Sequence, residues 1–269
     1  MRILCVGDIN GRPGRHIVQT QLPRLIAGRQ IDYSIGNVEN AADGFGVTPE
    51  IARQMLDAGF DCLTSGNHIW DKREIVDYLA EEPRLLRPLN YPDGAPGVGL
   101  YAGESPAGIP VTVINLMGRV FMPPCDDPFR VIDEALRAHD GAASVIVVDM
   151  HAEATSEKYA MGWHLDGRVS AVVGTHTHVQ TADERVFPGG TGYITDLGMT
   201  GPYESVIGIQ TDLALRKFRT GVPVRFTTAR RDVWLCGVVV DVDETTGRSR
   251  SIERIQIPAG DERNGESGE

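Results

Sequence analysis

Side chains that can bind metal ions follow five short apolar runs of this 269-residue chain. Each run has the length of a buried strand, and most are rich in Val and Ile. In order along the chain, the runs are followed by Asp8, by Glu39 and Asn40, by Asn67 and His68, by His151, and by His176 and His178. In open α/β sheets, ligands bind just beyond the carboxyl ends of the strands. We therefore expect the five strand ends to meet in one polar pocket.

The donor atoms of this pocket suit a pair of catalytic metal ions. Seven residues offer oxygen or imidazole nitrogen and no thiolate: Asp8, Glu39, Asn40, Asn67, His151, His176 and His178. Such a set favours iron, manganese or zinc in open coordination over a closed structural zinc site. Seven ligands are too many for one ion that must also hold water, and they suit two ions roughly 3.5–4 Å apart. Glu39 is expected to bridge the pair, because a carboxylate has two oxygens.

The segment Gly174–His178 is the strongest single block of the set. In an extended segment, residues i and i+2 point the same way, so His176 and His178 would present both imidazoles to one side. Taken alone, each block has an ordinary structural explanation: Asp8 could cap a helix, Glu39 and Asn40 could form a turn, and His151 could be a satisfied core histidine. The ordered set favours a metal site.

Several residues near these blocks have open alternatives. Lys158 could contact a phosphate, with a solvated helix face as the default interpretation. The loop Gly198–Gly201 could close over the pocket or form only a tight turn. Phe121 could line a substrate entrance or a subunit contact, with ordinary core packing as its default.

The elements that must position these residues alternate along the chain. Strands are expected at Ile3–Val6, Tyr33–Val38, Cys62–Ser65, Val111–Leu116, Ser144–Asp149, Val169–Gly174 and Gly192–Asp196. Amphipathic helices are expected between them, at Pro13–Ala27, Pro49–Ala58, Lys72–Ala80 and Pro128–Ala138. This alternation predicts layered α/β architecture.

The later part of the chain has a different texture. Val222–Thr228 and Val233–Val242 are predicted to be antiparallel strands that complete a second sheet. We expect a single domain over residues 1–258. Residues 259–269 are rich in Gly, Glu and Asp without an apolar anchor, and they predict a disordered tail.

Composition restricts the partners and the compartment. The net charge is −11, so the chain gains little general attraction to nucleic acid or anionic membranes, and we expect no stable binding to either. Bound metal would then supply local positive charge for a small anion. No stretch approaches the roughly 20 apolar residues that cross a bilayer. The 4 cysteines form no C-x-x-C pair, which favours a reduced, cytoplasmic protein.

The motifs together resemble the calcineurin-like metallophosphoesterases. The resemblance rests on Gly7-Asp8, an acid after the second strand, Gly66-Asn67-His68, a lone His151, and Gly174-Thr175-His176-Thr177-His178, all in the family's order. Asp8-Ile9-Asn10 replaces the usual D-x-H, and Glu39-Asn40 replaces the usual Asp. These departures resemble the YmdB-type branch of bacterial phosphodiesterases, as do the segments 116–122, 151–158 and 195–202. The resemblance extends from Arg2 to about Val242.

This resemblance implies a four-layer α/β/β/α sandwich and a dinuclear centre. One ion would be held by Asp8, Glu39, Asn40 and His178, and the other by Glu39, Asn67, His151 and His176. The family's proton donor corresponds to His68. The implied metals are iron, with manganese able to substitute. The implied reaction is hydrolysis of cyclic nucleotide phosphodiesters such as 2′,3′-cyclic AMP by a hydroxide that bridges the metals.

The resemblance leaves other functions open. The same site could serve a phosphomonoesterase or protein phosphatase, or a regulatory binding protein with a weakly active site. Family members affect colony or biofilm behaviour in some bacteria, which implies an unidentified regulatory protein partner. A homo-oligomer is expected only from the general frequency of oligomers among soluble enzymes.

Overall fold

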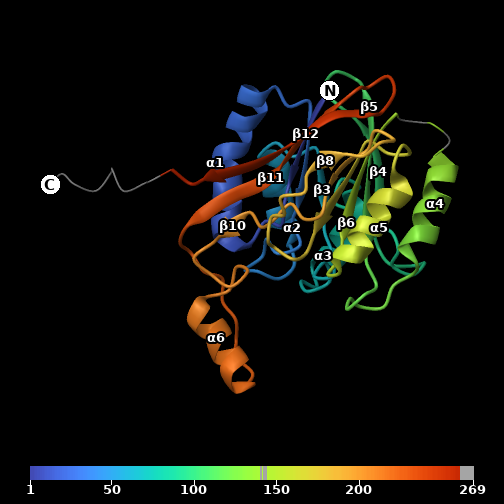
Figure 1. The fold of residues 1–269 in the computed structure, drawn as a ribbon. Helices are drawn as coiled ribbons and strands as arrows, with labels where there is room; N and C mark the ends of the chain where they lie inside the picture. Colours follow the sequence, from blue (N-terminus) through green and yellow to red (C-terminus); the bar gives the residue numbers. More distant parts are fainter. Residues whose placement is uncertain (140, 142–143, 261–269) are drawn as a thin grey trace.

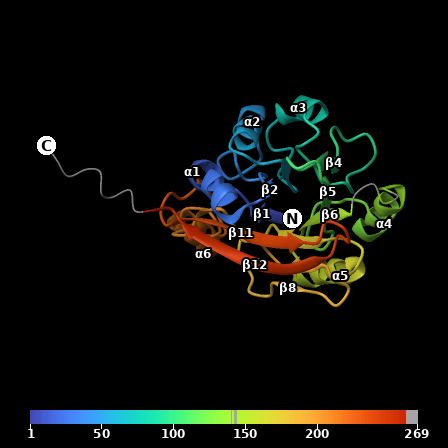
Figure 2. The same cartoon turned by 90° about the horizontal axis from the view of Figure 1, so that it is seen from above.

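Two β-sheets pack face to face in a computed structural model of the chain, which describes residues 1–139, 141 and 144–260 (Figures 1 and 2). The first sheet has the strand order β10 (Gly201–Pro202), β11 (Val233–Val242), β1 (Arg2–Val6), β2 (Tyr33–Asn37) and β3 (Cys62–Thr64), with β12 (Ser249–Pro258) also paired to β11. Strands β1, β2 and β3 are parallel, whereas β11 runs antiparallel to β1. Their shared direction brings the carboxyl ends of β1, β2 and β3 to one edge.

The second sheet repeats this arrangement. Its order is β4 (Leu100–Glu104), β5 (Pro110–Met117), β6 (Val145–His151), β7 (Ala171–Thr175), β9 (Gly192–Ile194) and β8 (Arg185–Val186). The four strands from β5 to β9 in this order are parallel, and β4 and β8 are antiparallel edge strands. The carboxyl ends of β6 and β7 therefore also share an edge.

Helices cover the outer face of each sheet, as the view from above shows (Figure 2). The first sheet is covered by α1 (Gly11–Arg29), α2 (Pro49–Asp57) and α3 (Ile75–Glu81), and the second by α4 (Pro128–His139) and α5 (Thr155–Leu165). Helix α6 (Thr211–Thr220) covers neither sheet and projects from the body (Figure 1). The predicted four-layer α/β/β/α sandwich is confirmed.

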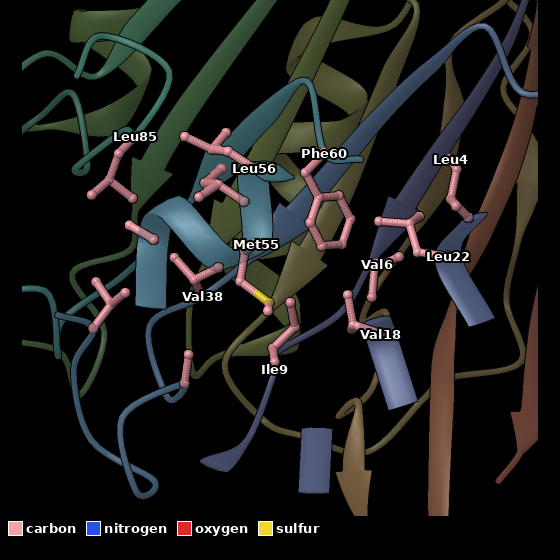
Figure 3. Packing of buried hydrophobic residues seen from close by; sticks show 14 of the residues in the cluster. Leu4, Val6, Ile9, Val18, Leu22, Val38, Met55, Leu56, Phe60 and Leu85 are labelled. Carbon is pink, nitrogen blue, oxygen red and sulfur yellow. The ribbon is translucent and has the colours of Figure 1, made fainter. Parts of the chain in front are cut away.

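Strand β1 illustrates why the layers form. Leu4 and Val6 pack with the helices in one core, as Figure 3 shows, whereas Ile3 and Cys5 pack in the core between the sheets. Successive side chains of a strand point to opposite faces, so a continuous apolar run suits a strand that is buried on both sides. Burying each such side chain contributes about 1.5–3 kcal/mol.

Two expectations for the later part of the chain are wrong. Residues 222–228 form no strand: most of their side chains face solvent, and Pro223 cannot donate a ladder hydrogen bond. The alternation of Val222, Val224 and Phe226 imitates a strand pattern, but the pairing of the segment is limited to the isolated bridge of Thr228 with Ile209. Strand β11 does not complete a second sheet but pairs with β1 in the first.

Two further predictions are not tested by this arrangement. One domain over residues 1–258 stays a prediction. Of the predicted tail at 259–269, residues 261–269 lie outside the described residues. No helix within the described ranges is long and apolar enough to span a bilayer.

Candidate metal centre

All eight predicted site residues lie at one edge of the two sheets. Asp8 follows β1, Glu39 and Asn40 follow β2, and Asn67 and His68 follow β3; His151 ends β6, and His176 and His178 follow β7. The parallel strands of the two packed sheets end at a common place, and this arrangement brings segments more than 100 residues apart into contact. The convergence expected from the strand ends is present.

The donor atoms form two groups that share Glu39. Glu39, His151 and His176 make one candidate metal-binding group, and Asp8, Glu39 and His178 make the other; within each group the ligand atoms lie within 4.8 Å of one another. The Oδ1 atoms of the two Asn residues extend the groups: Asn67 lies 3.1 Å from His151 Nε2, and Asn40 lies 3.1 Å from His178 Nε2. A glutamate common to both groups is placed to bridge two ions.

Three features of the site fit metal ions. His151 Nε2 lies 3.1 Å from both Glu39 Oε2 and His176 Nδ1, and ligand atoms about 2.1 Å from one ion and at right angles lie about 3 Å apart. Asp8 Oδ1 and Glu39 Oε1 are buried without a hydrogen-bond partner, although such atoms are normally paired. At Gly66 a Cβ would lie 2.2 Å from His151 Nε2 and 2.3 Å from Glu39 Oε2, so only glycine permits this approach.

The second ring nitrogen of each imidazole is held by the protein. His151 Nδ1 lies 2.9 Å from Thr175 Oγ1, which in turn donates to Asp149 Oδ1 at 2.6 Å. Asp149 is buried and also accepts from Asn37 and Thr64. Partners of this kind fix the ring orientation and tautomer of a metal ligand.

The other two imidazoles have partners of different kinds. His178 Nδ1 lies 2.9 Å from the Ile207 carbonyl oxygen, and His176 Nε2 lies 3.2 Å from Glu153 Oε2. The expected extended geometry is wrong here, because His176 and His178 have positive φ angles of 96° and 66°. A bend after β7 instead sends the two rings into different groups.

Lys158 has neither of its expected roles. It is fully buried, and its Nζ lies 2.7 Å from Asp196 Oδ2. The same oxygen accepts hydrogen bonds from Thr177 N and Thr177 Oγ1. This buried ion pair therefore holds the residue between the two histidines of the bend. The sequence pattern concealed it, because a lysine on a helix is usually solvated.

His68 lies at the pocket, apart from both groups. Its Nδ1 lies 2.8 Å from Asp71 Oδ2, and the ring of Phe45 packs edge-on at 5.1 Å. An Nδ1–H donated to Asp71 leaves Nε2 for the pocket. Neither Asp71 nor Phe45 was identified from the sequence, although the spacing of three residues from His68 to Asp71 was a usable signal.

Burial and the charges of neighbouring groups shift the pKa values of Asp8 and Glu39 in opposite directions. Burial raises the pKa of Asp8 to about 7, despite the nearby histidines. Burial also opposes ionisation of Glu39, but the charge of His151 and its hydrogen bond outweigh burial and lower the pKa of Glu39. The Glu39 carboxylate in turn raises the pKa of His151 against burial, whereas burial and then His151 lower the pKa of His176 to about 3. Without metal, Asp8 and His151 therefore hold a proton more readily than usual, and Glu39 and His176 less readily.

The pocket beside the centre has a cavity of about 250 Å³. Its walls include Asn10 and residues on both sides of α6, namely Ile207, Gly208, Ile209, Phe226, Thr227 and Thr228. Asn10 Oδ1 and Thr228 Oγ1 are buried without a partner. No sequence motif indicated the wall formed by residues 207–209 and 226–228, because both segments are irregular.

The loop Gly198–Gly201 supports the centre and does not cover it. Its residues are buried, Met199 N donates to the His178 carbonyl, and Thr200 N donates to the Asp8 carbonyl. The segment is not a tight turn either, because Thr200 forms a parallel bridge with Ile9 and Gly201 begins β10. Phe121 is 90% exposed, so core packing is wrong for this residue.

Comparison with known proteins gives matches over nearly the whole chain. The sequence profile of the YmdB-like protein family matches residues 4–255. The 2′,3′-cyclic-nucleotide 2′-phosphodiesterase of Bacillus subtilis strain 168 is 49% identical over 257 residues, covering 96% of this chain and 97% of that protein. A Mycoplasma genitalium protein provisionally named a phosphatase/phosphodiesterase is 34% identical over 269 residues, covering 98% and 95%.

Two solved structures share the fold over the same extent. A hypothetical protein from Thermus thermophilus matches with a TM-score of 0.90 and 41% identity, covering 96% of this chain and 99% of that one. A structure described as a novel phosphatase from Mycoplasma pneumoniae matches with a TM-score of 0.91 and 34% identity, covering 98% and 95%. The similarity thus includes both sheets and every strand end of the site.

Proposed function

Because the chain belongs to the YmdB-like protein family, as its motifs predicted, we propose that it is a metal-dependent phosphoric diester hydrolase acting on 2′,3′-cyclic nucleotides. The observation that carries this proposal is the pair of donor groups joined by Glu39. The name of the Bacillus subtilis relative supports the substrate class. A phosphatase acting on monoesters is the competing function, supported by the description of the Mycoplasma pneumoniae structure.

The proposal assigns the seven donors to two ions. Asp8, Glu39, Asn40 and His178 would hold one ion, and Glu39, Asn67, His151 and His176 the other. Iron is the expected metal, with manganese able to substitute. When bound, such a pair lowers the pKa of water and neutralises charge on phosphoryl oxygens. The contacts of the three imidazoles with Thr175, Glu153 and the Ile207 carbonyl would orient the ligand atoms toward the ions.

His68 would act on the leaving group. In a cyclic phosphate the leaving ribose oxygen gains negative charge as its bond to phosphorus breaks. His68 Nε2, with Nδ1 oriented by Asp71, can donate a proton or a hydrogen bond to that oxygen. Phe45 limits the ring's rotation from the side.

The charge of the centre favours a diester. Only two carboxylates, those of Asp8 and Glu39, belong to the donor groups, so two divalent ions leave the centre cationic even with a hydroxide present. A small positive charge matches a monoanionic diester more closely than it matches a dianionic monoester.

A comparison of substrates tests the proposal. We expect kcat/KM for 2′,3′-cyclic AMP to exceed that for p-nitrophenyl phosphate and a phosphoserine peptide by at least about tenfold, an attainable difference for one favourable contact set. The assay uses manganese-loaded protein with a chelator-treated sample as control. Faster turnover of the monoesters would contradict the phosphodiesterase function and favour the phosphatase.

A further inference from the structure

A basic arm projects from this acidic molecule beside the pocket. The arm comprises residues 211–231, which are helix α6 and the segment that follows it (Figure 1). It contains six basic residues and one acidic residue, in a chain whose net charge is −11. Charge of this density favours an anionic partner at this one place, against the trend of the whole molecule.

The cations of the arm are exposed and largely free of acidic partners. Among the described residues, no acidic group forms an ion pair with Arg216, Arg219 or Arg225, whereas Arg231 lies 3.4 Å from Glu204. Arg216 and Arg219 are one helical turn apart on α6 and therefore share a face. Phe218, between them in sequence, is 80% exposed. Single nucleic-acid strands are bound by cationic side chains that follow the backbone and by exposed aromatic rings on which bases stack, and the arm offers both kinds of side chain.

The base of the arm is part of the pocket. Residues 207–209, just before α6, and 226–228, within the arm, form one wall of the cavity. The Ile207 carbonyl also holds His178, with Ile207 itself at a positive φ of 44°. A ligand whose phosphate lies at the metal centre would therefore reach the arm if it extended beyond the pocket.

A cyclic mononucleotide does not use these cations, because its one phosphate would lie at the metal centre. A 2′,3′-cyclic phosphate is also the end left on an RNA chain when a 2′-hydroxyl displaces the next nucleotide. Helix α6, with 10 residues, is about 15 Å long. That length matches about four stacked nucleotides at about 3.4 Å each.

We propose that the substrate is an RNA strand ending in a 2′,3′-cyclic phosphate, with the arm binding the phosphates that precede the reacting end. Water would add to phosphorus, the bond between phosphorus and O2′ would break, and O2′ would leave with a proton. The strand would then carry a 2′-hydroxyl and a 3′-phosphomonoester. This inference rests on the proposed phosphodiesterase function and adds its substrate class.

A charge-removal variant tests the arm. The variant replaces Arg216, Arg219 and Arg225 with Gln, which preserves helix propensity. Its matched control replaces Arg24, Arg73 and Arg248 with Gln, three exposed arginines outside the arm that form no ion pair among the described residues. Manganese-loaded proteins are assayed with 2′,3′-cyclic AMP and with a tetraribonucleotide ending in the same cyclic phosphate, over a series of salt concentrations.

We expect the arm variant to lose about tenfold or more in kcat/KM for the tetranucleotide and less than about twofold for 2′,3′-cyclic AMP. Its salt slope for the tetranucleotide should fall by about 2, since each phosphate contact contributes about 0.7. The control variant should resemble the wild type. Equal effects of the two variants, or equal losses on both substrates, would overturn the inference.

Two further measurements separate the possible failures. Fluorescence anisotropy with a labelled tetranucleotide measures binding without turnover. Salt-sensitive binding that depends on the arm, with no hydrolysis of any substrate, would support RNA binding by the arm and contradict the phosphodiesterase function. Normal hydrolysis of 2′,3′-cyclic AMP without binding of the tetranucleotide would support the phosphodiesterase function and contradict RNA binding by the arm. A change of oligomeric state in sedimentation, confined to the arm variant, would make the arm a contact between copies of this chain and overturn its RNA role.

Discussion

Each histidine of the proposed centre has one ring nitrogen toward the donor groups and the other fixed by the protein. The fixing groups are chemically different: a hydroxyl on His151, a carboxylate on His176 and a backbone carbonyl on His178. A carbonyl can only accept, so it holds the His178 proton on Nδ1 and leaves Nε2 as a lone-pair donor. These contacts would hold the three imidazoles in the orientation that the proposed metal ions require.

His68 is expected to act in the reaction without binding metal. We predict that His68→Ala lowers kcat by about 10²–10⁴, the usual range for a general acid, and keeps both metals. Asp71→Asn should cause a smaller loss, because it only orients the ring. Elemental analysis of the purified variants beside their kcat values checks this. Metal content that falls in step with activity would make His68 a ligand instead.

Protons should compete with metal at Asp8 and His151. Both groups have raised pKa values in the metal-free protein, Asp8 chiefly through burial and His151 through Glu39. With a pKa raised to about 7, Asp8 changes its protonation between pH 6 and pH 8. Metal binding should therefore release more protons at pH 6 than at pH 8, and apparent affinity should fall as pH falls.

Calorimetry of manganese binding in two buffers with different ionisation enthalpies measures this release. Equal proton release at pH 6 and pH 8 would contradict the expectation that Asp8 changes its protonation in this range.

The convergence of the candidate ligands could be predicted from the sequence, because each one ends or closely follows a strand whose end lies at the shared edge; that they bind metal stays a prediction. Their supporting groups could not. Glu153 and Ile207 lie in loops whose positions depend on the assembled fold, and Asp149 points inward from the middle of an otherwise apolar strand. Thr175 was within reach of prediction, since it lies in the same block as His176.

The bend after β7 depends on an element packed behind it. Asp196, after β9, accepts hydrogen bonds at its Oδ2 from Thr177 N and Thr177 Oγ1 and from Lys158 Nζ of α5. The ion pair is buried, so both partners have lost their hydration and depend on each other. The position of two histidines thus depends on the packing of α5 against the sheet.

Removing the lysine should therefore destabilise the fold. We predict that Lys158→Met lowers the free energy of unfolding by about 3–5 kcal/mol, because it leaves the Asp196 charge buried and unpaired. The midpoint of thermal unfolding should fall by roughly 6–20 °C in a protein of this size. The double variant Lys158→Met with Asp196→Asn should recover part of the loss, since no unpaired charge remains. A single variant as stable as the wild type would contradict this account.

Some helices and strands could be predicted from the sequence and others could not. The parallel strands and the helices between them were predictable, since apolar runs and helical periodicity alternate. Strand β12 was not expected, because it is an edge strand with charged residues such as Arg250, Glu253 and Arg254 among its apolar ones. Helix α6 was missed because it packs against no sheet, and its charges and exposed Phe218 reflect a surface.

At the scale of the whole molecule, the two sheets form a frame whose shared edge holds the site. The core between them includes residues from both sheets, such as Ile3, Ile35, Val147 and Val173. A displacement of one sheet against the other would separate Asp8 and Glu39 from His151 and His176. The same frame places the proposed metal centre and a basic arm in an otherwise acidic protein.

The most direct test of the account is a titration of metal-free protein with Mn²⁺ while hydrolysis of 2′,3′-cyclic AMP is followed. The account predicts no turnover without metal and full turnover near two equivalents. Glu39→Gln, which weakens the bridge between both groups, should bind less metal and lose activity. Undiminished hydrolysis by metal-free protein, or two bound metals with no hydrolysis, would contradict the central claim.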